Sequence, residues 1–133
     1  MNNIIAITPG EPSGIGPDIT LKCLSKKINS RIFVIYDIEH LRYRAKKLNL
    51  NFKFKEINIY EDIKKCDGKV IYCQNVNLVS PVKIGIPCKN NSSFVIKCLK
   101  TAIKACLDNR ISAMVTGPVD KTIINKSGVK FSG

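Results

Sequence analysis

With 133 residues, the chain is long enough for one ordinary domain with a buried core. An apolar content of 44% and a charged content of 24% are typical of globular proteins and exclude a disordered chain. The net charge of +12 suggests nucleic acid as a partner, but the lysines are scattered and accompany no arginine-aromatic cluster, zinc-finger spacing or helix-turn-helix pattern. We therefore expect no nucleic-acid binding.

Cysteine and histidine usage restricts the chemistry further. The six cysteines form no C-x-x-C pair, and His40 is the sole histidine, so no metal-ligand spacing is visible and His40 is expected to be an ordinary helix or surface residue. We expect reduced thiols packed as small apolar groups in the cytoplasm. The apolar run 32–36 is too short to span a membrane, and residues 1–3 do not resemble a secretory signal.

The first predicted elements are a strand over residues 4–7, a glycine-rich loop and a helix over 17–27. Pro17 suits the first helical position, and Asp18 suits the positive end of the helix. This arrangement places backbone N–H groups at the carboxyl edge of a sheet, where α/β proteins bind ligands. The loop is neither a dinucleotide fingerprint, since Ile19 stands where a third glycine is needed, nor a P-loop.

The middle of the chain continues this alternation. A buried strand is predicted over 31–36, and Asp37 is expected to cap the next helix. In that helix, Leu41, Ala45 and Leu48 form the inner face, while a solvated basic side is expected at Arg42, Arg44, Lys46 and Lys47.

Beyond this helix the pattern predicts a half-exposed edge strand within 51–59, a connection or short helix over 61–68 and a strand over 69–73. Residues 74–88 contain Pro81, Gly85 and Pro87 and indicate an irregular excursion.

A second turn-to-helix unit closes the chain. Asn91 opens a long core helix whose apolar positions recur at three- and four-residue steps: Val95, Cys98, Leu99, Ala102, Ile103 and Cys106. A short buried strand over 113–116 leads into Gly117-Pro118 and another helix, which Gly128 is expected to close in a left-handed conformation. The alternation predicts an α/β fold with right-handed crossovers around a parallel or mixed sheet.

The two glycine-containing turns supply the candidate site residues, which are Gly10, Glu11, Gly14, Gly16, Thr116 and Lys121. The three loop glycines are expected to allow close approach of a ligand. Glu11 could accept a hydrogen bond from a ribose or substrate hydroxyl, or only stabilise its loop. Lys121 could bind a phosphate or carboxylate, or remain solvated. Asp18 is more simply explained by capping, and no residue can be assigned as general base.

Two segments resemble one known family. Residues 8–18 read T-P-G-E-P-S-G-I-G-P-D, and residues 116–133 read T-G-P-V-D-K-T-I-I-N-K-S-G-V-K-F-S-G. Both resemble 4-hydroxythreonine-4-phosphate dehydrogenases of pyridoxal phosphate (vitamin B6) biosynthesis, with Asp120 standing where Asn or His is expected. The resemblance implies an isopropylmalate-dehydrogenase-like fold, of which residues 1–133 would be the N-terminal part of the first domain. The rest of that domain and a second domain would be absent.

The resemblance also implies an activity. Family members oxidise 4-phosphooxy-L-threonine with NAD or NADP, use a divalent metal (zinc, magnesium or cobalt) and complete their sites across a homodimer. Their substrate-contacting His-Thr pair would follow residue 133, and their metal-binding histidines come later still. We therefore expect the 133-residue chain to contain no metal site, to be inactive alone and to expose an apolar sheet edge that invites aggregation.

Two other functions remain open. The chain could belong to a paralogous dehydrogenase of another 4-phosphorylated four-carbon acid, or it could be a non-catalytic module that binds a phosphate or nucleotide.

Overall fold

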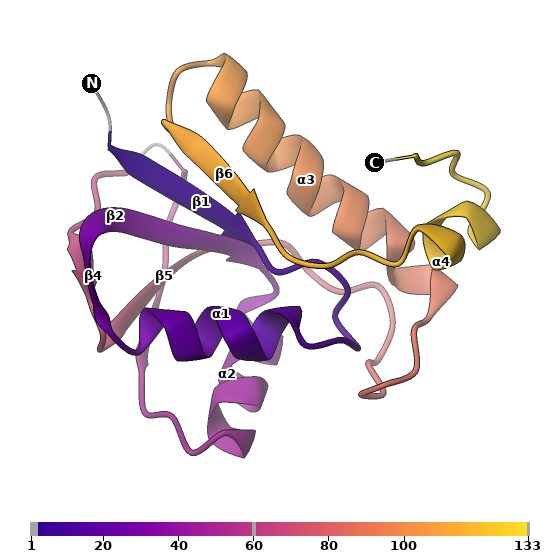
Figure 1. Cartoon of the computed structure of the whole chain (residues 1–133), viewed down its shortest axis with the longest axis horizontal. Coiled ribbons are helices and arrows are strands. Elements are labelled where there is room, and N and C mark those ends of the chain that lie inside the picture. Colours follow the sequence, from indigo (N-terminus) through magenta and orange to yellow (C-terminus); the bar gives the residue numbers. More distant parts are fainter. Residues whose placement is uncertain (1–2, 60, 133) are drawn as a thin grey trace.

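The computed structural model describes residues 3–59 and 61–132, and a single mostly parallel sheet runs through them (Figure 1). Its main strands are ordered β3-β5-β2-β1-β6 and all pair in parallel. Their bounds are Ile4–Thr8 for β1, Lys27–Tyr36 for β2, Lys53–Glu56 for β3, Val70–Asn75 for β5 and Ala113–Thr116 for β6. The predicted α/β class is confirmed. Met1, Asn2 and Gly133 lie outside the described residues, so the expectations that rest on them are not tested here.

Helices cover both faces of the sheet. The helices α1 (Gly16–Leu24) and α2 (Ile38–Lys47) lie on one side, and α3 (Ser92–Leu107) lies on the other, next to a short 3₁₀ turn, η1 (Lys89–Asn91) (Figure 1). The last helix, α4 (Lys121–Lys126), follows β6. The chain adds strands in one direction from β1 to β2 and β5, and then returns to place β6 on the opposite side of β1. The order of the sheet therefore reverses between β1 and β6.

The core follows the most apolar strand. The carboxyl half of β2 is buried at every position, and Val34, Ile35 and Tyr36 are each 0% exposed. Because α1 and α2 lie on one side of the sheet and α3 on the other, both faces of β2 are covered, which explains a continuous apolar run in place of an alternating one. Leu41 of α2 and Phe94 of α3 pack against this cluster from the two helical layers.

Several boundaries differ from the sequence prediction. The first helix ends at Leu24, and β2 begins at Lys27, so the connection between them is shorter than expected. Residues 61–68, expected to be a connection or short helix, contain the strand β4 (Lys65–Asp67), which pairs with β2 in antiparallel orientation. Three residues are too few for a period-two pattern to stand out, so the sequence signal was weak.

Other predictions are confirmed. The strand β3 lies at one edge of the sheet, with Lys53 and Lys55 exposed and Phe54 half-buried between them. Asp37 caps α2 by accepting a hydrogen bond from the His40 backbone N–H at 3.0 Å. Gly128 has a φ of 94°, in the left-handed region that was expected for it.

The opposite edge of the sheet is apolar and open. The strand β6 was expected to be buried, yet Val115 is 53% exposed, and on α3 the expected core residue Ile103 is 47% exposed, with Leu107 at 77%. Ile103 lies on a groove of about 650 Å³ between α3 and β6, which we call the α3–β6 groove. Its lining comprises Ile96, Leu99, Lys100, Ile103, Met114, Thr116, Gly117, Val119, Lys121, Val129, Lys130 and Phe131. The helix α3 thus has two apolar faces, of which one packs in the core.

Candidate functional site

The two glycine-containing turns meet where the order of the sheet reverses. They follow the carboxyl ends of β1 and β6, which pair in parallel with Thr8 opposite Thr116. The turns are joined by two backbone hydrogen bonds, from Glu11 N–H to the Pro118 oxygen at 2.9 Å and from Gly117 N–H to the Thr8 oxygen at 2.7 Å. Open α/β sheets bind ligands at such a reversal point, so the structure places these turns where a site is expected.

Three glycines of these turns stand where the neighbouring backbone leaves no room for a side chain. A Cβ on Gly10 would lie 2.2 Å from the Pro118 oxygen, and Gly10 also has a φ of 88°. A Cβ would lie 1.8 Å from the Pro9 oxygen at Gly16 and 2.1 Å from the same oxygen at Gly117. The sequence predicts that Gly10 and Gly16 allow the approach of a ligand. The structure adds a packing requirement at both: Gly10 meets the other turn, and Gly16 meets the backbone of its own turn.

A cleft of about 540 Å³ opens beside the joined turns, and we call it the loop cleft. It is lined by Glu11, Ser13, Gly14, Ile15, Gly85, Pro87, Pro118, Val119, Asp120 and Lys121. Three of the six candidate residues therefore come together: Glu11, Gly14 and Lys121. Gly10 and Gly16 are not among the residues that line the cleft, and Thr116 lines the α3–β6 groove.

The carboxylate of Glu11 is held in place by its own loop. One oxygen, Oε1, accepts hydrogen bonds from the Ser13 backbone N–H at 3.2 Å and from Ser13 Oγ at 2.9 Å. The Oε2 atom makes no hydrogen bond within the part of the chain that the structure describes. Glu11 can thus stabilise its loop and still present an acceptor to a hydroxyl or amine in the cleft, which combines both sequence interpretations.

Lys121 supplies a cation to the same cleft. It is the first residue of α4, is exposed and lines both the loop cleft and the α3–β6 groove. The adjacent Asp120 caps α4 by accepting a hydrogen bond from the Ile123 backbone N–H at 3.0 Å. Among residues 3–59 and 61–132, no ion pair links these neighbours, so Asp120 leaves the ammonium group of Lys121 available to an anion.

Part of the cleft lining comes from the irregular excursion, for which the sequence indicated no role. Gly85 donates a backbone hydrogen bond to the Ser13 oxygen at 2.7 Å, so the excursion touches the glycine loop directly. Its base is fixed by the buried side chain of Asn91, which contacts residues 79 and 80, and by Asp37, whose Oδ2 accepts from the Leu78 N–H at 2.8 Å. Only the proline and glycine content of the excursion could have suggested this, and such content does not specify what a loop contacts.

Asp18 has a different role from the one predicted. Its carboxylate forms a two-pronged contact with the guanidinium of Arg44, with Nε to Oδ1 at 2.7 Å and a second, shorter contact from the other nitrogen. Arg44, expected on the solvated side of α2, is only 8% exposed. The pair ties α1 to α2 directly behind the glycine loop, so Asp18 is a structural residue that acts through an ion pair rather than a cap.

Three of the six thiols are buried, as expected for reduced cysteines, and none forms a disulfide within the described chain. Burial raises the pKa of Cys73 to about 12 and, likewise, the pKa of Cys98 to about 12. Such thiols remain protonated and unreactive at neutral pH.

Within the described part of the chain, neither a cluster of metal-binding side chains nor a membrane-spanning helix is found. Throughout residues 3–59 and 61–132, no cluster of three or more His, Cys, Asp or Glu side chains could hold a metal ion. No helix in the same residues has the length and apolar character needed to cross a bilayer.

Comparison with known proteins gives a consistent result. The family described as "Pyridoxal phosphate biosynthetic protein PdxA" matches residues 28–133. A 4-hydroxythreonine-4-phosphate dehydrogenase of Pseudoalteromonas translucida is 39% identical over 97% of this chain and 39% of its own length. The enzyme of that name from Saccharophagus degradans is 36% identical over 98% of this chain and 38% of its own. A solved structure from Salmonella typhimurium, described as a candidate 4-hydroxythreonine-4-phosphate dehydrogenase, superposes with a TM-score of 0.89 at 25% identity, covering 99% of this chain and 42% of that one.

The parallel sheet, its reversal point and the cleft between two turns define an α/β protein with the isopropylmalate-dehydrogenase-like fold. Relatives with the same fold are dehydrogenases. The chain belongs to the PdxA family, and it spans about two fifths of the length of the curated relatives that it matches.

Proposed function

We propose that this chain is the N-terminal part of the first domain of an NAD(P)-dependent 4-hydroxythreonine-4-phosphate dehydrogenase of pyridoxal phosphate biosynthesis. The observation that carries the proposal is the 39% identity to a curated dehydrogenase of that name along 97% of the chain. The location of the loop cleft at the reversal point of the sheet supports it, because this is where α/β dehydrogenases place their ligands.

The proposed reaction is the oxidation of the secondary alcohol of 4-phosphooxy-L-threonine. A bound NAD or NADP would supply the hydride acceptor for the alcohol carbon, and the hydroxyl proton would leave to a base. The resulting 3-oxo acid loses carbon dioxide and gives 3-amino-2-oxopropyl phosphate. The described residues offer no ligand set for a metal, so we assign no step to one.

The residues of this chain would bind and orient the reactants. Glu11, whose Oε1 atom is held by Ser13, would accept a hydrogen bond from a hydroxyl or amine group at Oε2, because the hydrogen bonds from Ser13 use only Oε1. Lys121, which lines the same cleft, would pair with the phosphate or carboxylate of the substrate. An anchored acceptor and a cation in one cleft suit a ligand that carries both a polar group and an anion.

We further propose that the remainder of a full-length family chain covers the α3–β6 groove. The groove is apolar, β6 has one unpaired edge and the relatives carry about three fifths of their length in addition to the matched part. Lys100, Lys121 and Lys130 at the groove favour an acidic rim on the covering segment. The homodimer and the cytoplasmic location belong to the same proposal and rest on family membership.

A binding experiment tests the role of the cleft. Adding 4-phosphooxy-L-threonine should shift the amide NMR signals of Gly14 and Lys121, and Lys121→Ala should weaken binding about tenfold, the value of one exposed charge-assisted contact. Lys126→Ala, a matched lysine at the other end of α4, should leave binding unchanged. Equal loss in both variants, or shifts that avoid the loop cleft, would contradict the proposed substrate orientation.

The two alternatives make different predictions. A paralogous dehydrogenase would bind another 4-phosphorylated four-carbon acid more tightly at the same residues. A non-catalytic module that binds a phosphate or nucleotide would bind its ligand with full affinity in the 133-residue chain, and adding the family's downstream sequence would not increase that affinity.

A further inference from the structure

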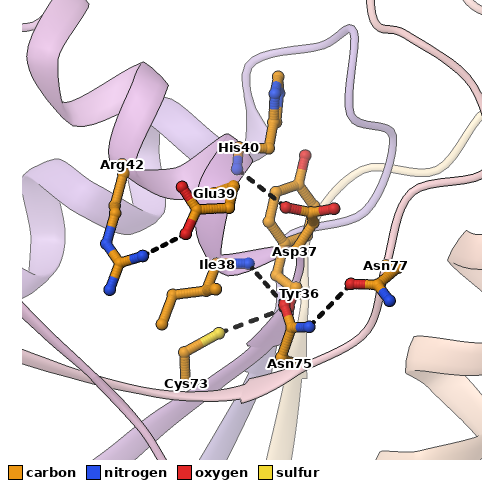
Figure 2. Close-up of polar contacts among 9 residues, drawn as sticks. All are labelled: Tyr36, Asp37, Ile38, Glu39, His40, Arg42, Cys73, Asn75 and Asn77. Carbon is orange, nitrogen blue, oxygen red and sulfur yellow. Dashed lines mark hydrogen bonds and ion pairs between the residues drawn. The ribbon is translucent and has the colours of Figure 1, made fainter.

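The irregular excursion leaves the sheet through residues that are firmly hydrogen-bonded. Asn75, the last residue of β5, accepts a hydrogen bond at Oδ1 from the Ile38 N–H at 2.9 Å, and its Nδ2 atom donates to Asn77 Oδ1 at 2.9 Å (Figure 2). The Leu78 N–H donates to Asp37 Oδ2 at 2.8 Å. These bonds fix residues 75–78 to the start of α2.

A second set of bonds fixes the following residues to the start of α3. The side chain of Asn91, directly before α3, accepts at Oδ1 from the Val79 N–H at 3.1 Å and from the Ser80 N–H at 2.9 Å, and its Nδ2 atom donates to the Ser80 oxygen at 3.1 Å. Asn91 is itself buried. We call residues 75–80 the base of the excursion, and we expect this base to open only together with the helices that it joins.

The part of the excursion beyond the base is held much more weakly. We call residues 81–87 the tip. Across residues 3–59 and 61–132, one hydrogen bond joins the tip to the rest of the chain, from the Gly85 N–H to the Ser13 oxygen at 2.7 Å. The branched apolar side chains of the tip lie outside the hydrophobic core: Val82, Ile84 and Ile86. Movement of the tip would therefore break a single hydrogen bond and remove no side chain from the core, so it should cost little free energy.

The tip borders the loop cleft and exposes apolar groups there. Gly85 and Pro87 line the cleft. Ile84 and Ile86, on either side of Gly85, are 47% and 62% exposed, and Ile15, which lines the same cleft, is exposed as well. One exposed isoleucine is ordinary in a folded protein. Three beside one cleft favour a state in which the tip moves over a bound ligand, because apolar surface would then leave water.

We propose that the tip is a lid, which opens and closes over the loop cleft as a separate unit while the base stays in place. The Gly85–Ser13 hydrogen bond holds the lid in the position that the structure describes. Closing over a ligand would exclude water from the cleft, as lids do in many enzymes. The proposal rests on the proposed function only in taking the loop cleft as a ligand site.

Amide hydrogen exchange, followed by NMR, compares the tip with the base of the same excursion. After correction for intrinsic rates, the amides of Gly85 and Ile86 should exchange at least about tenfold faster than those of Val79 and Ser80. Adding 4-phosphooxy-L-threonine should slow exchange at Gly85 and Ile86 and leave Val79 and Ser80 unchanged.

Replacing Gly85 by alanine tests whether the lid moves separately. Gly85 has a φ of 83°, and a Cβ there would meet nothing within 4 Å, so the variant strains the backbone of the tip without a clash. Exchange at residues 85 and 86 should rise about five- to thirtyfold, the ratio that corresponds to a left-handed alanine. The midpoint of urea unfolding should shift little, because the lid opens before the core does. The matched control Gly128→Ala, with a φ of 94° and equally open space, should lower that midpoint and leave exchange in the tip unchanged.

Three results would overturn the proposal. The first is exchange at Gly85 and Ile86 as slow as at Val79 and Ser80. The second is a Gly85→Ala variant whose urea midpoint falls as far as that of Gly128→Ala. The third is a substrate that shifts the Gly14 signal, as the proposed function expects, without slowing exchange at Gly85. A substrate that binds nowhere on the chain would contradict the proposed function instead, and the first two measurements would still decide whether the tip is a separate unit.

Discussion

Replacing Gly10 by alanine tests whether the two glycine-containing turns are held together as the structure describes. The new Cβ would meet the Pro118 oxygen at 2.2 Å, and the backbone already has a φ of 88°. The left-handed conformation costs a non-glycine residue about 1–2 kcal/mol, and an overpacked contact that separates the turns costs about 1–3 kcal/mol more. We expect Gly10→Ala to lower the free energy of unfolding by about 2–5 kcal/mol in total.

Three further glycines separate the two contributions. Gly128 has a φ of 94°, and a Cβ added there would meet nothing within 4 Å. Gly128→Ala should therefore lower the free energy of unfolding only by the cost of the left-handed conformation, about 1–2 kcal/mol. Gly117 has no positive φ, but a Cβ there would lie 2.1 Å from the Pro9 oxygen. Gly117→Ala should therefore lower the free energy of unfolding only by the cost of the overpacked contact. Gly14→Ala, with its nearest contact at 3.4 Å, should change little.

The assay is urea unfolding of the four variants followed by circular dichroism at low protein concentration. Amide exchange at Glu11, whose N–H bonds to the Pro118 oxygen, should accelerate in Gly10→Ala and Gly117→Ala alone. Equal losses in Gly10→Ala and Gly128→Ala would refute the reasoning, because the contact between the turns would then contribute nothing.

Three other predictions follow from the packing of the chain. Arg44→Met should cost about 2–3 kcal/mol in urea unfolding by leaving the carboxylate of Asp18 half-buried without its partner, and a loss under about 0.5 kcal/mol would mean that the pair is not formed. Cys73 should resist alkylation under conditions that label the exposed Cys23, and equal labelling rates would contradict its burial. The free energy of unfolding should also fall as the pH rises above about 8.5, because the thiol of Cys73 releases its proton at lower pH in the unfolded chain than in the folded one. Ile103→Lys should reduce self-association in sedimentation, and an unchanged distribution would exclude the α3–β6 groove as the contact.

Much of the fold could be predicted because local chemistry and tertiary packing agree. The β-branched run that ends at Tyr36 forms a strand in almost any buried context, and Asp37 both stops that strand and caps the next helix. The two turns of Gly10 and Gly117 were placed at one sheet edge because parallel strands bring their carboxyl ends together.

The sequence predictions that were wrong concern residues whose environment depends on contacts distant in sequence. Arg44 was expected in solvent because α2 carries basic residues on that side, and only the approach of Asp18 from α1 makes its burial favourable. Ile103 satisfies helical periodicity as well as Ala102 does, but periodicity does not say whether a second apolar face has a partner. The strand β4 is too short to produce a pattern of its own.

The candidate site was predicted in part for the same reason. Glu11 and Lys121 were recognised by residue type and position, and the structure places both on the loop cleft. The anchoring of Glu11 by Ser13 and the wall formed by Gly85 depend on how loops contact each other, which no local pattern encodes. Thr116 shares a strand end with these residues but lines the α3–β6 groove instead.

Cofactor reduction tests the central claim most directly. The assay would combine 4-phosphooxy-L-threonine, NAD or NADP and a divalent metal with the 133-residue chain, and with the same chain extended by the downstream sequence of a full-length relative. We predict reduced nicotinamide only from the extended protein, because the described residues contain no metal-ligand cluster and the α3–β6 groove is uncovered. Activity in the short chain would contradict this by showing a complete site within it, and a folded extended protein that reduces no cofactor would contradict the dehydrogenase assignment itself.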